Sequence, residues 1–593
     1  MKKWLLLLSA AAVISSCNNA GNNTGNTPGY DLQHLCSDYW EEHLMLFPTE
    51  ATSIGDNRFN DKLTITIAQS FRDSLGRFYK KYLDKINAID SSKLTGNDVI
   101  SYRLFKYDMN MNIEGLKYPN HLMPITQFWS FTLEFPQLGS GTGNQPFKTV
   151  KDYDDWLKRM AQFPAWVDTA IYNMKQGMEK GWVLPHSLVV KVLPQLRSVV
   201  KTDDTASIFY GPAKMFPKEF SQADKDRLTA ALKDGIQKQI NVSYSKLADF
   251  FEKEYLPKSR ATSGLSGVPG GDEYYKYCIK YWTTTNLSAD SIYKTGLNEV
   301  ARIEAEMVKV KEKVGFKGDL HAFFEYVSKD KKFCPFTTAK QVLDSFWAIK
   351  KIEEPYLKKY FNKVPKTQFE IRQTEEFRAA SASAEYNQGS EDGTRPGIFY
   401  VPILNPKEFG ATGMATLFLH EAIPGHHYQI SLAQENKGLP AFRRFVWYGA
   451  YGEGWAHYCE TFGTAFGLYD DPYQYFGHLS DAMHRAIRLV VDIGLHQKNM
   501  SREDAIKYMM AHESITEHDA TAEIERYMAI PGQALSYKIG QMGILNERKF
   551  YEEQLGKDFN MASFHDEVLK DGCVPLNVLH DKLAAWSKTQ TKK

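Results

Sequence analysis

The strongest constraint on the fold is a helical spacing of apolar residues that recurs along most of the chain. Residues 288–314 show it well, with Ser288 or Asp290 placed to cap the first turn. The apolar face of this segment carries Ile292, Gly296, Val300, Ile303 and Met307. Similar patterns occupy 67–89, 150–179, 221–254, 338–361, 476–500 and 501–513. Neither a repeat period nor an alternating strand series is present, which argues against a solenoid, a propeller or a sandwich. The sequence therefore predicts a mainly α-helical protein.

A stretch rich in glycine and proline, residues 258–275, interrupts this helical pattern. We expect it to divide an N-terminal helical portion, residues 30–260, from a C-terminal helical portion, residues 272–593. One interlocked body is the alternative.

A second interruption, residues 386–404, is a polar loop that leads into the apolar sequence GIFYVPIL at 397–404. Its β-branched and aromatic residues predict a short strand. Two roles are open to this strand. It is either an edge strand that pairs with an extended substrate backbone, or an internal strand that only packs.

The N-terminus has the features of an export signal, with a basic start, a short apolar run and small residues before Cys17. Residues 14–17, Ile-Ser-Ser-Cys, resemble the bacterial lipobox, so residues 1–17 are predicted to be a lipoprotein signal ending at a lipidated Cys17. Simple secretion is the alternative. Residues 18–29 then form a flexible tether to the lipid bilayer. Asn18 after the cysteine favours the outer membrane of a bacterial cell envelope.

The charge balance bears on possible partners. Seventy-two basic and seventy-one acidic residues give a formal net charge of +1, which offers no overall basic field for nucleic acid. The five cysteines after Cys17 are scattered and show no C-x-x-C pair, so neither a disulfide framework nor a thiolate zinc site is indicated.

The segment LFLHEAIPGHHYQI, residues 417–430, comes close to the zinc-hydrolase motif H-E-x-x-H. The spacing differs, because the second histidine is His426 or His427 rather than the fourth residue after His420. On a regular helix His426 would point about 240° away from His420, whereas His427 would return to within about 20°. Pro424 and Gly425 favour a kink or bulge that absorbs two residues and returns His426 to the face of His420. We predict His426 as the metal ligand, with His427 as the alternative.

A second helical segment, residues 451–463, carries Glu453, His457 and Glu460 on one face. Buried carboxylates need partners. The spacing suits Glu453 as a metal ligand, with His457 and Glu460 orienting the ligating imidazoles. A structural network of buried polar residues is the alternative.

Four polar residues spaced by fours form a further stripe on the segment 476–500. They are His484, Arg488, Asp492 and His496. The stripe is either the lining of a cleft or a solvated face, and we favour the lining.

Four segments together resemble the bacterial domain-of-unknown-function 885 family over essentially the whole mature length. They are HEAIPGHHYQ (420–429), YGEGWAHYCE (451–460), RAIRLVVDIGLH (485–496) and RYMAIPGQALSYKIG (526–540). This family is similar to gluzincin peptidases, which implies a zincin-like fold: two helical lobes around a deep cleft, with a small β-sheet beside the metal helix. The resemblance implies one Zn²⁺ per chain on His420, His426 and Glu453, with Glu421 as general base.

The same resemblance implies a hydrogen-bond donor from a downstream segment for the oxyanion of the reaction. Tyr527 and Tyr537 are the candidates, with Arg526 and Gln533 as possible substrate clamps. The expected function is a zinc-dependent peptidase acting on peptides. The alternatives are a binding lipoprotein that does not cleave its ligand, and a metal-dependent hydrolase of another amide or ester. The sequence leaves endo- and exopeptidase action open.

Overall fold

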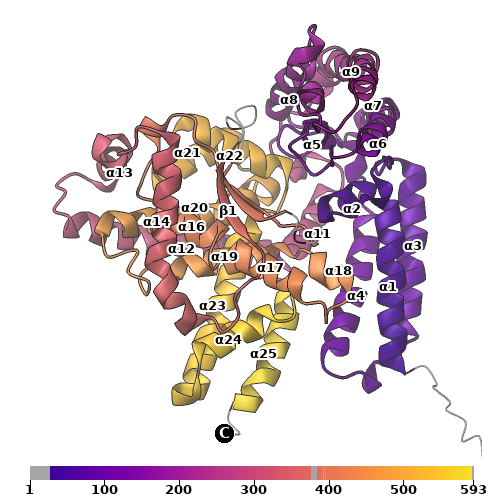
Figure 1. Ribbon diagram of the computed structural model, residues 1–593. Helices are drawn as coiled ribbons and strands as arrows, with labels where there is room; N and C mark the ends of the chain where they lie inside the picture. The colour runs from indigo at the N-terminus through magenta and orange to yellow at the C-terminus, as the bar shows by residue number, and fades with distance from the viewer. Residues whose placement is uncertain (1–26, 375–378, 380–382, 392, 394, 591–593) are drawn as a thin grey trace, which may run out of the picture.

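The computed structural model describes residues 27–374, 379, 383–391, 393 and 395–590, and it is mainly helical (Figure 1). The prediction of a mainly helical protein with one small sheet is confirmed. The signal peptide, Cys17 and the tether up to residue 26 lie outside the described residues. The first helix begins at Pro28, and the Thr27 hydroxyl caps it by accepting a hydrogen bond from the amide of Tyr30.

The first four helices pack against the C-terminal part of the chain and share its hydrophobic core. They are α1 (Pro28–Leu46), α2 (Pro48–Ile54), α3 (Gln69–Asn87) and α4 (Asn97–Gly115). That core joins Leu35 and Phe105 of these helices to Phe418 and Trp455, which flank the histidine motif in space.

The next six helices form a separate group, seen at the upper right of Figure 1, with a hydrophobic core of their own. They are α5 (Phe131–Gly139), α6 (Val150–Met160), α7 (Phe163–Lys180), α8 (His186–Val199), α9 (Gln222–Gly235) and α10 (Val242–Phe250). Two π-helical segments, Ile236–Asn241 and Phe251–Tyr255, flank α10. We call this group, from Ile125 before α5 to the end of α10, the upper lobe.

The remaining helices form the body that carries the histidine motif. The first are α11 (Gly271–Thr283), α12 (Ala289–Lys313), α13 (Leu320–Lys329), α14 (Ala339–Tyr360), α16 (Met414–Glu421), α17 (His426–Glu435) and α18 (Ala441–Phe445). The others are α19 (Gly449–Cys459), α20 (Pro472–Gln497), α21 (Arg502–His512), α22 (Glu517–Ala529), α23 (Leu535–Leu555), α24 (Met561–Leu569) and α25 (Leu576–Gln590).

The helices α19 and α23 approach each other closely at two glycines. A Cβ atom on Gly454 would lie 2.5 Å from the backbone of Gly540, so a larger residue at either position would force the helices apart. Because Gly454 follows Glu453, this contact fixes the part of α19 from which the glutamate projects.

The sheet is three-stranded, in the order β1-β3-β2, and lies beside α16 and α17. Its strands are β1 (Phe369–Gln373), β2 (Glu385–Asn387) and β3 (Gly397–Val401). β3 is the strand expected in the GIFYVPIL sequence; it is central and fully buried, pairing parallel to β1 and antiparallel to β2. Of its two possible roles, β3 therefore has the internal one, and β1 and β2 form the two edges of the sheet.

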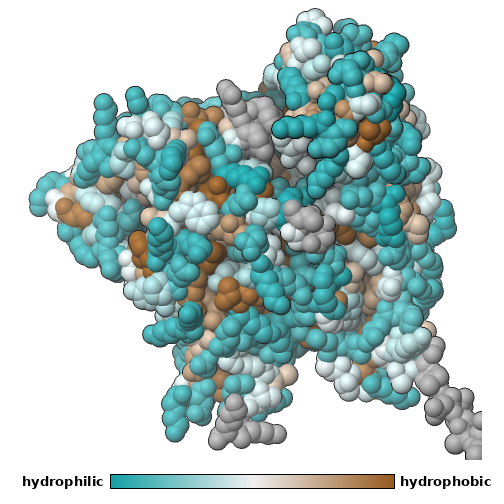
Figure 2. All heavy atoms as spheres, in the orientation of Figure 1, coloured by the Kyte–Doolittle hydropathy of each residue, from teal (hydrophilic) through white to brown (hydrophobic). Residues whose placement is uncertain are grey.

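The helix boundaries follow the predicted patterns closely where caps are strong. Ser288 caps α12, and Ser501 caps α21 by accepting a hydrogen bond from the amide of Asp504. Within the described residues, no helix combines the length and apolar character that a bilayer crossing requires. The face seen in Figure 2 is largely hydrophilic, with apolar residues in scattered patches. The five cysteines after Cys17 are free thiols.

Candidate metal centre and active site

The histidine motif is a break between two helices rather than a kink within one. Helix α16 ends at Glu421 and α17 begins at His426, with a cis Ile423–Pro424 peptide bond in the connection. A Cβ atom on Gly425 would lie 1.8 Å from the carbonyl oxygen of His420, so only glycine fits where the chain turns back. The expectation of a kink or bulge is thus corrected to a complete helix break, which brings His426 next to His420.

The two adjacent histidines point to different places. The ring centroids of His420 and His426 lie 4.9 Å apart, and both side chains face the same cavity. His427 faces the sheet instead: its Nδ1 lies 3.0 Å from the hydroxyl of Tyr386 on β2, and its ring contacts Phe369 on β1. His427 therefore holds the sheet against α17, and His426 is the histidine that faces His420.

Glu453 on α19 completes a set of three donor atoms. Its Oε2 lies 3.7 Å from Nε2 of His420 and 3.5 Å from Nε2 of His426. Two ligands at 2.0–2.2 Å from a tetrahedral zinc ion are separated by about 3.3–3.5 Å. Glu421 also belongs to this group, because its carboxylate and the two imidazoles can bring donor atoms within 4.8 Å of one another. The donor set therefore fits a divalent metal such as zinc.

Glu460 orients the imidazole of His420 from behind. Its Oε1 lies 2.8 Å from Nδ1 of His420 and its Oε2 lies 2.8 Å from Nδ1 of His457. A carboxylate accepts from both nitrogens, so each ring carries a proton on Nδ1, and Nε2 of His420, on the side of Glu453, is the nitrogen left to bind a metal. The predicted neighbours His457 and Glu460 are both fully buried. They act on the donor set through this contact.

The electrostatics of the site favour a positive charge at the donor set. Burial alone lowers the pKa of His420, but hydrogen bonds with Glu453 and Glu460 outweigh burial and raise this pKa to about 10. Burial alone would raise the pKa of Glu453, but the two histidines outweigh burial and lower this pKa below its ordinary value. Glu421 differs, because burial raises its pKa above the ordinary value. A divalent cation would supply the positive charge that these carboxylates stabilise.

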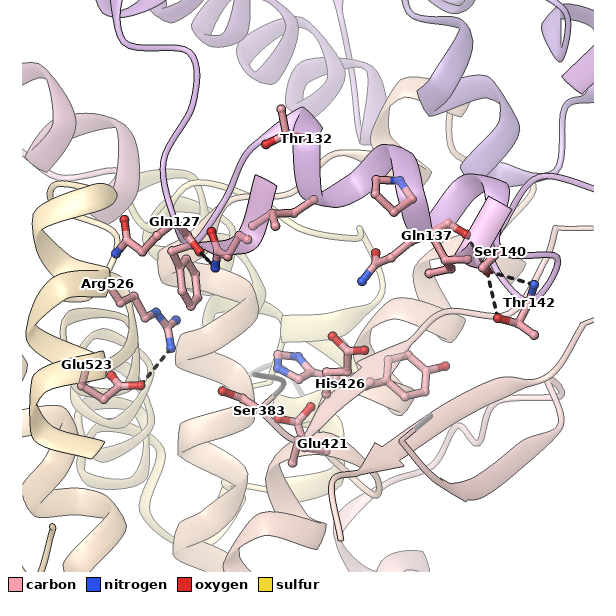
Figure 3. Close-up of a pocket in the computed structure, with 18 of the residues that line it drawn as sticks. Gln127, Thr132, Gln137, Ser140, Thr142, Ser383, Glu421, His426, Glu523 and Arg526 are labelled. Carbon is pink, nitrogen blue, oxygen red and sulfur yellow. Dashed lines mark hydrogen bonds and ion pairs between the residues drawn. The ribbon is translucent and has the colours of Figure 1, made fainter. Parts of the chain in front are cut away.

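The donor set opens into a cavity of about 1430 Å³ between the upper lobe and the body. Figure 3 shows Glu421 and His426 on one side of it, with Gln137 and Ser140 from the α5 region on the other. The edge strand β2 contributes Glu385 and Tyr386 to the lining. An extended ligand in this cavity would therefore lie beside β2 as well as beside the donor set.

The structure separates the four downstream candidates into two pairs. Tyr537 and Arg526 line the cavity, and the ring of Tyr537 stacks 6.4 Å from that of His420. Gln533 lies behind them, where its amide donates to the Tyr537 hydroxyl. Tyr527 is buried, with its hydroxyl bonded to Glu523 and Arg488. Tyr537 is thus the tyrosine that can reach a ligand at the donor set.

The polar stripe on α20 is divided in the same way. His484 and Arg488 line the cavity. Asp492 is buried and accepts hydrogen bonds from the hydroxyl of Tyr275 and the amide of Gly532. His496 accepts from the amide of Leu265, so it holds the loop that the sequence places between the two portions of the chain. Half of the stripe lines the cleft, and the other half anchors loops.

Sequence reasoning missed several cavity residues. Arg485 lies three positions before Arg488, a helical spacing that could have revealed it. Trp447, whose ring lies 5.8 Å from that of His426, precedes α19 in a loop with no periodic signal. The wall formed by the upper lobe, which includes Gln127, Gln137 and Thr142, was also missed. These residues reach the site through long-range packing that no local pattern encodes.

The comparisons with known proteins concern the fold and the family of the chain. A crystal structure of a candidate lipoprotein from Colwellia psychrerythraea is similar over 95% of this chain and 100% of its own, with 26% identity and a TM-score of 0.88. A candidate lipoprotein of unknown function from Shewanella oneidensis shares the fold, with 19% identity over 93% of this chain and 99% of its own, and a TM-score of 0.69. The comparison with curated proteins gives no match. The family model described as bacterial protein of unknown function (DUF885) matches residues 48–583, and the chain belongs to that family.

Proposed function

We propose that this protein is a zinc-dependent peptidase that hydrolyses peptide bonds. The proposal rests on one observation: the donor atoms of His420, His426 and Glu453 lie close together in the lining of a large cavity, with Glu421 beside them. Two imidazoles and one carboxylate are the protein ligands of many catalytic zinc sites, which leave a further position open.

His420, His426 and Glu453 would hold the ion, and Glu460 would fix the tautomer of His420. When bound, zinc supplies Lewis-acid chemistry by polarising a carbonyl and acidifying water. Glu421 is the general base: its carboxylate takes the proton of the attacking water and returns it to the leaving amine.

Tyr537 is the proposed donor to the developing oxyanion. Its ring lies beside His420, and its hydroxyl accepts hydrogen bonds at 3.2 Å from Arg526 and at 3.3 Å from Gln533. Because those two groups donate to the oxygen, the hydroxyl proton is free to be donated elsewhere. We assign as the acceptor of this proton the carbonyl oxygen that becomes negatively charged near the donor set.

The structural relatives described as candidate lipoproteins support a lipid-anchored location in the cell envelope, with Cys17 as the attachment point. Replacing Cys17 with alanine is then expected to release the protein from the membrane fraction. Persistent membrane attachment of that variant would count against the anchor.

A binding lipoprotein that does not cleave its ligand would use the same cavity, and so would a hydrolase of another amide or ester. The presence of Glu421 in the donor group favours the enzyme, because a binder does not need a base there. Metal-loaded protein should cleave members of a peptide library, a chelator should abolish cleavage, and Glu421→Gln should bind metal without turnover. Full cleavage by Glu421→Gln would contradict the proposal.

A further inference from the structure

Three arginines gather at one end of the cavity. Arg485 and Arg488 come from α20 and Arg526 comes from α22, and all three line the cavity. In Figure 3, Arg526 lies to one side of Glu421 and His426, next to Glu523. We call these three residues the arginine cluster.

The acidic residues around the cluster do not use all of its donors. Glu523 is shared: Arg488 Nη2 lies 3.1 Å from its Oε2, and Arg526 Nη1 lies 3.6 Å from its Oε1. Arg485 pairs with Asp481 at 3.3 Å. Among the described residues, Arg488 Nη1, Arg526 Nε and Arg485 Nε are buried nitrogens without a hydrogen-bond partner. Buried N–H groups of charged side chains are costly to leave unpaired, so the cluster has capacity for an added anion.

Tyr537 connects the cluster to the candidate metal centre. The guanidinium carbon of Arg488 lies 4.5 Å from the centre of the Tyr537 ring, and the ring of His420 stacks on Tyr537 with 6.4 Å between centroids. Arg526 donates to the hydroxyl of the same tyrosine. Tyr537 thus contacts both His420 of the donor set and the arginine cluster, so a short peptide segment can span the two.

The upper lobe closes the cavity at this end. The side-chain amide of Gln127 donates to the backbone carbonyl of Glu525 at 3.0 Å. The guanidinium of Arg526 lies 4.9 Å from the centre of the Phe128 ring. Figure 3 shows Gln127 above Arg526 at this end. A peptide that enters the cavity meets a wall here, and the wall is positively charged.

We infer that the enzyme acts on peptides from their C-terminal end and that the arginine cluster binds the terminal carboxylate. This inference rests on the proposed peptidase function. Water adds across the scissile amide: its hydroxyl goes to the carbonyl carbon and its proton to the leaving nitrogen, which releases a short C-terminal fragment. Arg526 and Arg488 bind the carboxylate of that fragment, and Phe128 and Gln127 prevent a longer chain from continuing past them.

The test compares three forms of one peptide with the full-length metal-loaded protein: the C-terminal acid, the C-terminal amide, and an amide that ends in glutamate. Loss of a charge-assisted pairing should lower kcat/KM for the amide at least about tenfold relative to the acid. The glutamate amide separates a terminal carboxylate from a side-chain carboxylate and should behave like the plain amide. Equal cleavage of acid and amide, or full recovery with the glutamate amide, would overturn the inference while leaving a peptidase.

Two variants locate the effect. In Arg526→Gln the preference for acid over amide should fall below about threefold. Arg502→Gln is the matched control, because Arg502 pairs with Glu525 beside the cluster and does not line the cavity; it should keep the full preference. An unchanged preference in Arg526→Gln would remove this residue from the carboxylate site.

A binding measurement keeps the inference separate from catalysis. Calorimetry with the Glu421→Gln variant should give at least about tenfold tighter binding of the acid than of the amide. If the wild-type protein cleaves neither peptide, the peptidase proposal fails, and this binding difference still decides whether the carboxylate site exists. Equal binding of the two forms would overturn it.

Discussion

Nε2 of His426 lies 3.5 Å from Oε2 of Glu453, whereas the adjacent His427 faces the sheet. A continuous helix would instead turn His427 toward His420. The relationship depends on the break between α16 and α17 at Pro424 and Gly425. It assigns separate tasks to the two adjacent histidines.

This assignment predicts different outcomes for two alanine variants. His426→Ala should lose bound metal and activity together, because it removes one of the three donors. His427→Ala should keep one metal per chain, while its thermal stability falls because the contact with Tyr386 is lost. Elemental analysis and thermal unfolding of both proteins measure this. Metal retained in His426→Ala but lost in His427→Ala would reverse the assignment.

Glu460 is predicted to act on the metal through His420. Glu460→Gln should weaken metal binding about 10–100-fold, because the imidazole loses a charged acceptor that fixes its tautomer. Competition with a chelator of known affinity measures the change. The helix should stay folded by circular dichroism, and an unchanged metal affinity would show that the contact with His420 is only structural.

Gly425 is predicted to be intolerant of any side chain. Gly425→Ala places a Cβ atom against the carbonyl oxygens of His420 and Leu419, and we expect about 1–3 kcal/mol of lost stability together with weaker metal binding. Gly410→Ala is the matched control, since a Cβ atom there meets nothing within 4 Å. Urea unfolding compares the two variants. Equal stability would mean that the turn between the helices can relax.

Asp492 should make stability depend on pH. Burial raises the pKa of this carboxyl to about 7 in the folded protein, whereas an unfolded aspartate titrates near about 3.9. Between these values the folded state holds a proton that unfolding releases, so this contribution to stability is full at low pH and declines as pH rises toward 7. The slope from one such group is at most about 1.4 kcal/mol per pH unit.

Asp492→Asn should remove that component while keeping an acceptor for the amide of Gly532. Urea unfolding at pH 5, 6 and 7 gives the free energy of unfolding for both proteins. Their difference should change steadily across this range in the direction that disfavours the wild type at higher pH. A constant difference would contradict the raised pKa.

The donor set could be predicted from sequence because it comes from two short helical segments. His420, Glu421 and His426 lie within seven residues, and Glu453 lies in α19 seven residues before Glu460, which caps the end of that helix. The helix break itself was underestimated, since Pro424 and Gly425 indicate a defect without fixing its size. β2 was not predicted, because Glu385–Asn387 is too short and too polar to show a strand pattern.

The opposite wall of the cavity could not be read from the sequence. Gln127 and Glu525 are 398 positions apart, and their contact depends on how the upper lobe packs against α22. The same is true of Tyr537 and Tyr527: both contact Arg488, yet Tyr537 lines the cavity and Tyr527 is buried. Local periodicity predicted the helical segments that form the site, whereas tertiary packing determines which of their residues face the cleft.

The central claim is that His420, His426 and Glu453 hold one metal ion. Anomalous diffraction from crystals of the zinc-loaded protein, collected on both sides of the zinc absorption edge, tests it most directly. We predict one strong peak per chain at bonding distance from Nε2 of His420, Nε2 of His426 and a carboxylate oxygen of Glu453. A zinc peak elsewhere, or none at these three side chains in zinc-loaded crystals, would contradict the account.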